Sequence, residues 1–425
     1  MITSRALRDR HLCACLAAAL GLVAGRSHAA VTVAIDDCGD ADTVGSLRNT
    51  IAAAANNAVI DVSACSTITL LQGELFLTKS VTIQGKANGT TTIDANYLGR
   101  ALHGFASAPY NSLTLSSITL THGRDLSPAY AHGGCIEMPY VTLLDSVATD
   151  CIAKSDYAKG GAIKGEKVTL QNSRVENSSA QGTTGYQRGG GIYSHSDFTC
   201  TSSSITGNET TGTNFSANGG GVSTFGSVAM ASCTIASNSS SGTSAGLFNY
   251  VFSAGHTFEI SNSTVSGNTA HRFAAMSTNQ NLTMKNSTVV NNSAPLCGGV
   301  YVQGNIQLVS SIAAQNTRED PYCGDLVATG SIAGEFNLVS LVQTPVPVDT
   351  IVANPLLTPL AYRGGPTPTH GLSIGSPAID AGSNADLLAT DQRGPGFARE
   401  VGAHADIGAF ERQADDDQLF YGGFD

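Results

Sequence analysis

The sequence predicts an all-β protein folded as a right-handed parallel β-helix, a solenoid with an amino-terminal cap and an irregular carboxy-terminal closing segment. Three observations predict it: a triplet that recurs along the chain, glycine clusters that precede apolar residues, and asparagines at a constant offset from the triplet. The right hand is expected because consecutive parallel strands strongly prefer right-handed connections.

The recurring triplet alternates a large apolar residue, a small or polar residue and a second large residue. This period of two is typical of a strand with one buried face. Successive copies begin 24 to 30 residues apart. Repeats of that length hold about three short strands, and since one repeat cannot bury its own apolar face, they stack on one another. The copies are Val141–Leu143, Val168–Leu170, Phe198–Cys200, Val228–Met230, Phe258–Ile260, Leu282–Met284 and Ile306–Leu308.

Glycine clusters and asparagines mark two further positions of the repeat. Glycine permits close approach of neighbouring coils, and an apolar residue follows each cluster. Five asparagines stand ten residues after the start of their triplet, so we expect a column of stacked amides that hydrogen-bond along the axis. We interpret this column as structural, because amides paired with one another have little capacity left for a ligand. The clusters begin at Gly133, Gly160, Gly189, Gly219 and Gly298, and the asparagines are Asn208, Asn238, Asn268, Asn292 and Asn316.

Eight cysteines follow the apolar amino-terminal run, an even number that permits disulfides in an exported protein. Cys200 takes the inward position of a triplet, where it is expected to behave as a buried apolar residue. Cys233 lies three places further along its own coil, out of vertical alignment with Cys200, so we expect that these two do not pair. The predicted disulfides are Cys38 with Cys65, Cys135 with Cys151, and Cys297 with Cys323.

Both ends of the chain differ from the repeat. Arg5, Arg8 and Arg10 precede an apolar run and the small-residue site Ser27–Ala29, which is the pattern of a cleaved signal peptide. Prolines after residue 340 cannot donate to a strand ladder, so this part is expected to close the solenoid rather than extend it. The predicted division is a signal peptide at 1–29, an amino-terminal cap at 30–66 with one short helix over 49–55, the parallel β-helix at 67–340, the closing segment at 341–412 and a mobile tail at 413–425.

Charge and hydrophobicity limit the partners. The formal net charge is −11, and removal of the arginine-bearing signal makes it more negative, which disfavours nucleic acid. No later segment approaches the roughly 18 consecutive apolar residues of a membrane span, so no transmembrane segment is expected after signal cleavage. We therefore expect an exported monomer, extracellular or on the cell surface of a Gram-negative-type bacterium, whose partner is an extracellular surface, glycan or protein.

Motifs near both ends occur together in a known group of proteins. Gly45–Arg48 follows Cys38, and five short motifs occur in order near the carboxy terminus. With these motifs the chain resembles the bacterial secreted β-helix proteins of the choice-of-anchor Q type, with an amino-terminal motif similar to the CSLREA type; Asn354 and Gly45 depart from the usual Asp and Cys. The resemblance implies surface display or secretion and brings no catalytic residues. The five motifs are Asn354–Leu356, Gly364–Thr367, Gly375–Asp380, Asp391–Gly394 and Asp406–Glu411.

The sequence assembles no recognisable reaction centre. Acidic residues are scattered through the repeats, and Asp145 and Glu176 do not recur at neighbouring positions of adjacent coils, as a catalytic pair or Ca²⁺ site would require. The chain has no Trp for sugar stacking, although Tyr193 and Tyr301 offer rings. We predict a non-enzymatic secreted or surface-displayed protein of adhesion or extracellular interaction, with no catalytic residue, cofactor or metal. The alternative is a polysaccharide lyase or hydrolase acting on an acidic polymer.

Three further polar groups have structural interpretations. The histidines lack metal-ligand spacing and are interpreted as solvated loop residues. A charged set near the end is expected to hydrogen-bond the irregular closing segment, and an acidic run near residue 40 is interpreted as solvated because it lacks an EF-hand pattern. The histidines are His103, His122, His132 and His195, the charged set is Asp391, Arg393, Asp406 and Glu411, and the acidic run is Asp36, Asp37, Asp40 and Asp42.

Overall fold

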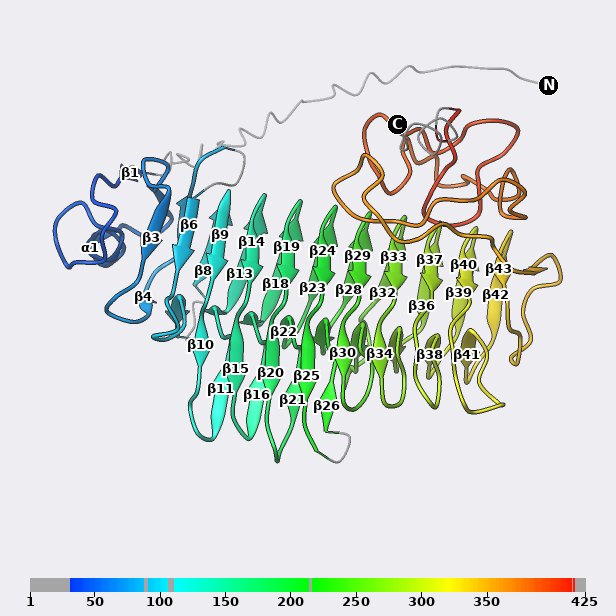
Figure 1. Cartoon of the computed structure of the whole chain (residues 1–425), viewed down its shortest axis with the longest axis horizontal. Coiled ribbons are helices and arrows are strands. Elements are labelled where there is room, and N and C mark those ends of the chain that lie inside the picture. The colour runs from blue at the N-terminus through cyan, green and yellow to red at the C-terminus, as the bar shows by residue number, and fades with distance from the viewer. Residues whose placement is uncertain (1–30, 88–90, 106–110, 214–215, 415, 417–425) are drawn as a thin grey trace, which may run out of the picture. The chain divides into compact units, whose positions relative to one another are not determined.

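The computed structural model describes residues 31–87, 91–105, 111–213, 216–414 and 416. Its strands pair in parallel, and successive coils of the chain add strands to three long sheets (Figure 1). The architecture is the parallel β-helix that the repeat predicts. The predicted signal peptide and most of the predicted tail lie outside the described residues.

Sheet 1 contains the predicted triplets. Its strands stack in register, so that Val141 pairs with Val168 and Leu143 with Leu170. The first and third residues of each triplet are buried, because successive side chains of a strand point to opposite faces. The described strands of sheet 1 are β1 (Thr32–Ala34), β2 (Ala58–Asp61), β5 (Val81–Gln84), β8 (Ser112–Ser116), β13 (Tyr140–Leu144), β18 (Lys167–Gln171), β23 (Phe198–Thr201), β28 (Val228–Ala231), β32 (Phe258–Ser261), β36 (Leu282–Lys285), β39 (Ile306–Val309) and β42 (Ile332–Glu335).

Sheet 2 follows sheet 1 in each coil after a sharp bend. Residues at the bend, among them Asn172 and Asn262, have φ of 48° and 52°, a left-handed conformation that Asn tolerates better than most residues. The described strands of sheet 2 are β3 (Thr67–Thr69), β6 (Thr91–Asp94), β9 (Ile118–Thr121), β14 (Val147–Thr149), β19 (Arg174–Glu176), β24 (Ser204–Thr206), β29 (Thr234–Ala236), β33 (Thr264–Ser266), β37 (Thr288–Val290), β40 (Ile312–Ala314), β43 (Leu338–Val339) and β44 (Ile351–Val352).

Sheet 5 completes the coil and leads back to sheet 1. Its strands begin just after the predicted glycine clusters, and the Cβ position of Gly161 would lie 1.9 Å from the carbonyl oxygen of Gly190 in the next coil. The cluster therefore allows a contact that any side chain would block. The described strands of sheet 5 are β4 (Leu75–Leu77), β7 (Leu102–Gly104), β12 (Ile136–Glu137), β17 (Ile163–Gly165), β22 (Ile192–Ser194), β27 (Val222–Thr224), β31 (Leu247–Asn249), β35 (Met276–Thr278), β38 (Val300–Val302) and β41 (Leu326–Ala328).

Sheets 3 and 4 form an arm that the sequence analysis did not predict. About three strands were expected per repeat, as found from β36 to β38, but the coil from β13 to β17 has five. Small side chains fill much of the space between the two sheets of the arm, where Ala131, Ala153, Ala158 and Ala180 are fully buried. Sheet 3 contains β10 (Arg124–Asp125), β15 (Ile152–Lys154), β20 (Ser179–Gln181), β25 (Glu209–Thr211), β30 (Ser239–Ser240) and β34 (Thr269–Ala270); sheet 4 contains β11 (Tyr130–His132), β16 (Tyr157–Lys159), β21 (Gln187–Arg188) and β26 (Ala217–Asn218).

The five predicted asparagines form one buried row inside the solenoid. Asn238 Nδ2 donates to the carbonyl oxygen of Ile205 and to Asn268 Oδ1, both at 3.0 Å, and Asn268 Oδ1 also accepts from the backbone N–H of Asn238. The same pattern repeats in neighbouring coils and ends on Asp325 Oδ1, which lies 2.9 Å from Asn316 Nδ2. The row thus satisfies backbone groups at a bend where strand pairing is interrupted.

A short helix covers the amino-terminal end of the core. Helix α1 spans Leu47–Ala53 and begins two residues before the predicted range, because Ser46 caps it by accepting from the N–H of Asn49 at 3.2 Å. Leu47 and Ile51 are buried. No helix among the described residues has the length and apolar character needed to cross a membrane.

Four disulfides join cysteines of the described chain. Three join the cysteines that the sequence analysis paired, Cys38–Cys65, Cys135–Cys151 and Cys297–Cys323. The fourth joins Cys200 to Cys233, so the expectation that these two do not pair is wrong. Cys233 occupies the bend after sheet 1, directly above Ser203 of the preceding coil, and this bend keeps its Cα only 6.3 Å from that of Cys200. A shift of three residues along a sharp bend remains within disulfide range.

The chain beyond β44 packs against sheet 2 (Figure 1). Its contacts are largely polar: Thr234 Oγ1 donates to the carbonyl oxygen of Pro368 at 2.6 Å, and the N–H of Ala409 donates to Thr288 Oγ1 at 3.0 Å. An apolar group that includes Ile407 and Phe410 is buried beside them. This segment covers sheet 2 from β29 onward and leaves sheet 5 uncovered.

Candidate functional site

Side chains of sheets 4 and 5 meet on one side of the solenoid, on a surface that we call the lateral face. His132 Nδ1 lies 3.1 Å from Glu137 Oε1, and Lys159 Nζ lies 5.3 Å from the ring centre of Tyr193, so the two sheets converge. Strand register places one residue of each row in each coil. The lateral face consists of His132, Lys159 and Arg188 from sheet 4, Glu137, Lys164 and Tyr193 from sheet 5, and the aromatic residues described below.

An ion-pair network closes the amino-terminal end of the lateral face. Arg100 lies 2.9 Å from Glu74, 3.0 Å from Asp125 and 2.9 Å from Glu137. Asp125 belongs to the arm, while Glu137 belongs to sheet 5. The network therefore fixes the arm against the solenoid with charge-assisted hydrogen bonds.

Both glutamates of this network are held in the ionised form. Burial alone would raise the pKa of Glu137, but the hydrogen bond with His132 and the charges of Lys164 and Arg100 outweigh it and lower the pKa to about 2. The hydrogen bond with His103 is the largest contribution that lowers the pKa of Glu74 to about 2. These carboxylates are already occupied by cations of the protein.

Lys159 and Arg188 have no such carboxylate. They pair strand to strand in sheet 4, and neither forms an ion pair with an acidic residue among the described part of the chain. Burial lowers the pKa of Lys159, and the positive charges of Arg188 and Lys164 lower it further. Arg188 Nε is buried without a hydrogen-bond partner.

Tyr193 lies at the centre of the lateral face, beneath Lys159. Its hydroxyl lies 3.2 Å from Nδ1 of His195, whose ring is exposed. Burial raises the pKa of Tyr193, so the phenol stays protonated at neutral pH.

Two aromatic clusters flank the cations. Tyr157 lies between Tyr130 and Tyr186 of the neighbouring coils, with ring centres 5.2 Å and 6.3 Å away. On the other side, the rings of Phe225 and Phe252 are nearly parallel, with centres 5.9 Å apart. The second cluster also contains Phe248 and Tyr250.

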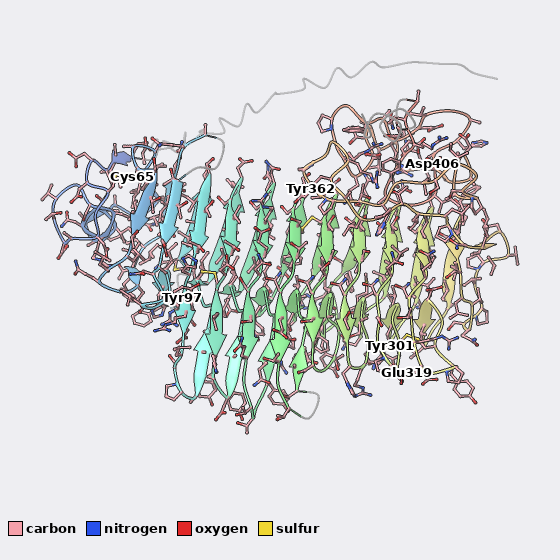
Figure 2. The ribbon with its side chains drawn as sticks, in the orientation of Figure 1. Cys65, Tyr97, Tyr301, Glu319, Tyr362 and Asp406 are labelled. Atoms are coloured by element: carbon pink, nitrogen blue, oxygen red, sulfur yellow. A yellow bond between two sulfur atoms is a disulfide. The ribbon has the colours of Figure 1, made fainter. Side chains whose placement is uncertain are left out.

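Arg188 joins the two clusters. Its guanidinium lies 5.1 Å from the ring centre of Tyr186 and 4.7 Å from that of Phe225. Further along sheet 5, Tyr301 stacks on Phe273 with centres 4.4 Å apart, and Figure 2 shows Tyr301 on the side away from the closing segment. Of the two rings singled out in the sequence, Tyr193 is thus covered and Tyr301 is partly exposed.

The histidines are not all solvated loop residues, and this expectation is corrected. His103 lies in β7 and His132 in β11, and both contact carboxylates of the network. His195 contacts Tyr193, whereas His122 lies on another side of the coil, 3.0 Å from Asp94. Stacking brings together His103 and Glu74, which are 29 residues apart, whereas His132 and Glu137 are five residues apart in the same coil.

The acidic run is solvated only in part. Asp40 is buried, 2.8 Å from Arg48, and accepts hydrogen bonds from the N–H groups of Leu71 and Gln72. It therefore anchors the cap to the first coil. Asp36 and Asp42 are exposed.

The charged set of the closing segment hydrogen-bonds that segment, as expected. Arg393 lies 2.8 Å from Asp391, with its guanidinium carbon 4.0 Å and 3.9 Å from the ring centres of Phe397 and Phe410. Burial raises the pKa of Glu411 to about 8. Across the described residues, His, Cys, Asp and Glu side chains nowhere form a group of three or more that could hold a metal ion.

Sequence reasoning missed the two unpaired cations, although a signal for them exists. The residue immediately before each of four glycine clusters occupies the same position of sheet 4. A comparison of these preceding residues would have revealed a polar row along one side of the arm. They are His132, Lys159, Arg188 and Asn218.

Fold and lateral face define a parallel β-helix protein with a cationic and aromatic side. No family model and no curated protein matches the chain. A solved structure, the crystal structure of pectate lyase Pel9A, is similar to it with a TM-score of 0.49 and 14% identity, over 90% of this chain and 98% of the other. This similarity concerns the course of the backbone and assigns no role to any residue here.

Proposed function

We propose that the protein is a non-enzymatic, secreted or surface-displayed β-helix protein that binds a polysaccharide on its lateral face. The observation that carries the proposal is the pair of aromatic clusters on a side of the solenoid that the closing segment leaves free. Phe252 is 80% exposed and Tyr186 is 52% exposed. Exposed aromatic groups framed by polar residues are typical of binding surfaces.

The arrangement of the rings suits a polymer better than a small ligand. Tyr130, Tyr157 and Tyr186 stand on successive coils, and neighbouring strands of a sheet are about 4.8 Å apart. A row with this spacing offers one ring after another along the solenoid axis. An extended sugar chain lying along the axis can stack on several of them at once.

Affinity electrophoresis of the full chain, in gels that contain dissolved polysaccharides, tests the proposal. Tyr186→Ala is expected to weaken the affinity read from retardation roughly fivefold, because one stacking contact contributes about 1 kcal/mol. Tyr362→Ala is the matched control, since Tyr362 is 59% exposed but lies in the closing segment (Figure 2). Equal effects of the two substitutions, or no retardation by any polysaccharide, would contradict the proposal.

A second candidate is a polysaccharide lyase acting on an acidic polymer. Lys159 favours it, because burial and neighbouring cations lower the pKa of the amine and increase the neutral fraction that can act as a base. In such a step the Lys159 amine takes the proton beside the uronate carboxyl, a carbon–carbon double bond forms, and the glycosidic oxygen leaves and is protonated by water. Ultraviolet absorbance of unsaturated uronates measures this reaction, and a wild-type rate equal to that of Lys159→Gln would exclude it.

The proposal includes export. Residues 1–29 are taken as a cleaved signal peptide, and the end motifs support membership of the choice-of-anchor Q group. The four disulfides agree with an oxidising compartment. Fractionation of host cells with antibody detection, followed by amino-terminal sequencing, tests this part. Cytoplasmic protein with its first 29 residues intact would contradict it.

A further inference from the structure

Two cations on neighbouring coils of the arm stand side by side without an anion. Lys159 and Arg188 are opposite one another in the parallel register of β16 and β21. Both point toward sheet 5, since Lys159 lies over the ring of Tyr193 and Arg188 over that of Phe225. Neither is fully exposed, so water screens them less than it screens typical surface lysines and arginines.

Other cations on the same surface are neutralised by carboxylates of the protein itself. Arg100 has three carboxylates within 3.0 Å, and Lys164 lies 3.2 Å from Glu137. Asp125 and Glu137 lie one coil before Lys159, and Glu74 lies three coils before it. In the coil of Lys159, Glu166 acts on the amine only through its charge and forms no ion pair with it among the described residues, so the pair lacks the direct carboxylate contacts that Arg100 and Lys164 have.

Repulsion between the two cations is unfavourable unless an anion joins them. The charge of Arg188 opposes protonation of Lys159, and nearby acids compensate only in part. Arg188 Nε also has no acceptor. A carboxylate placed between the two side chains would accept from the half-buried guanidinium and from the ammonium and would supply the pair with an anion.

We infer that the occupant of the lateral face is a linear polyuronate, whose carboxylates are bound by Lys159 and Arg188 while its sugar rings stack on the flanking aromatic clusters. This inference rests on the proposed function and adds the chemical class of the ligand. Charge complementarity selects an anionic chain, and the rings on both sides of the cations select a sugar polymer over a free anion. One carboxylate per sugar suits cations that are repeated from coil to coil.

The test uses the full chain and three polymers: alginate, its propylene glycol ester and dextran sulfate. Lys159→Gln and Arg188→Gln are each expected to weaken the affinity for alginate at least roughly tenfold, because each removes a charge-assisted hydrogen bond to a carboxylate. The salt dependence of alginate binding should fall in parallel. Lys154→Gln is the control, since Lys154 is exposed in sheet 3 of the same arm and should leave both unchanged.

The outcomes separate this inference from the proposed function. If Tyr186→Ala weakens binding but Lys159→Gln and Arg188→Gln do not, the inference that the ligand is a polyuronate is overturned, whereas the proposed polysaccharide site stands. Binding of the ester as tight as that of alginate, or of dextran sulfate as tight as that of alginate, also overturns it. If no polymer binds, both proposals fail. Unchanged circular dichroism and thermal unfolding show that the variants are folded.

Discussion

The asparagine row and the lateral face both repeat one position through successive coils, but they treat polar groups in opposite ways. In the row, each amide donates to the amide of the next coil and accepts from that of the preceding coil, so stacking satisfies every member that has a neighbour. On the lateral face, stacking places Lys159 beside Arg188, and like charges cannot satisfy one another. Stacking one residue type from coil to coil therefore stabilises groups that both donate and accept hydrogen bonds, whereas stacked like charges require a partner of opposite charge.

The largest effect is expected inside the row. Asn268→Ala removes the acceptor for two groups of Asn238 and the donor to Ile235 and Asn292, all of them buried. The free energy of unfolding should fall by about 3 to 5 kcal/mol, because buried polar groups lose their partners. Urea unfolding measures it. Asn281→Ala is the control: Asn281 accepts from the N–H of Asn305 at an exposed site, so a loss below about 1 kcal/mol is expected.

The unexpected disulfide gives the next largest effect. Cys200 and Cys233 are 33 residues apart, and replacing both by Ser should lower the free energy of unfolding by about 2 to 4 kcal/mol. The pair Cys135 and Cys151 is 16 residues apart and should contribute less, by about 0.6 kcal/mol for the halved loop. Mass spectrometry of unreduced peptides checks the connectivity. Free thiols at Cys200 and Cys233 would refute this pairing.

The stability contributed by Glu137, at the amino-terminal end of the lateral face, should depend on pH in the acid range. The folded pKa of Glu137 is about 2 against an ordinary 4.5, so its stabilisation is present above pH 4.5 and is lost as the pH falls toward 2. Glu137→Gln should remove on the order of 2 kcal/mol of this dependence. Unfolding midpoints at several pH values measure it. Glu259→Gln, at an exposed position of β32, should leave the acid limb as it is in the wild type.

The smallest expected effect is the change in stability when Lys159 is replaced, and it tests the contrast between the lateral face and the asparagine row. Lys159→Gln removes a cation that repels Arg188 and has no carboxylate, so stability should stay equal or rise by up to about 1 kcal/mol. Thermal unfolding without polysaccharide measures it. A clear loss of stability would mean that Lys159 has a structural partner, and the lateral face would then resemble the asparagine row.

The repeat was readable because its chemistry is local. Triplets that alternate between faces, glycines at a close approach and asparagines at one offset each report a contact with the same position one coil away. Register then follows from spacing, which is why Val141 over Val168 and Asn238 over Asn268 could be predicted. The arm was missed, because its alanines have no strong strand pattern and its strands are two or three residues long.

The sequence by itself determined the solenoid, its asparagine row and three of the four disulfides. Only the tertiary structure decided what meets across different sheets: Cys200 with Cys233 around a bend, His132 with Glu137, and Lys159 above Tyr193. The physical reason is that vertical neighbours are set by the repeat length, which can be counted along the chain. Neighbours across a corner depend on the angle between sheets, and that angle arises from the packing of whole coils.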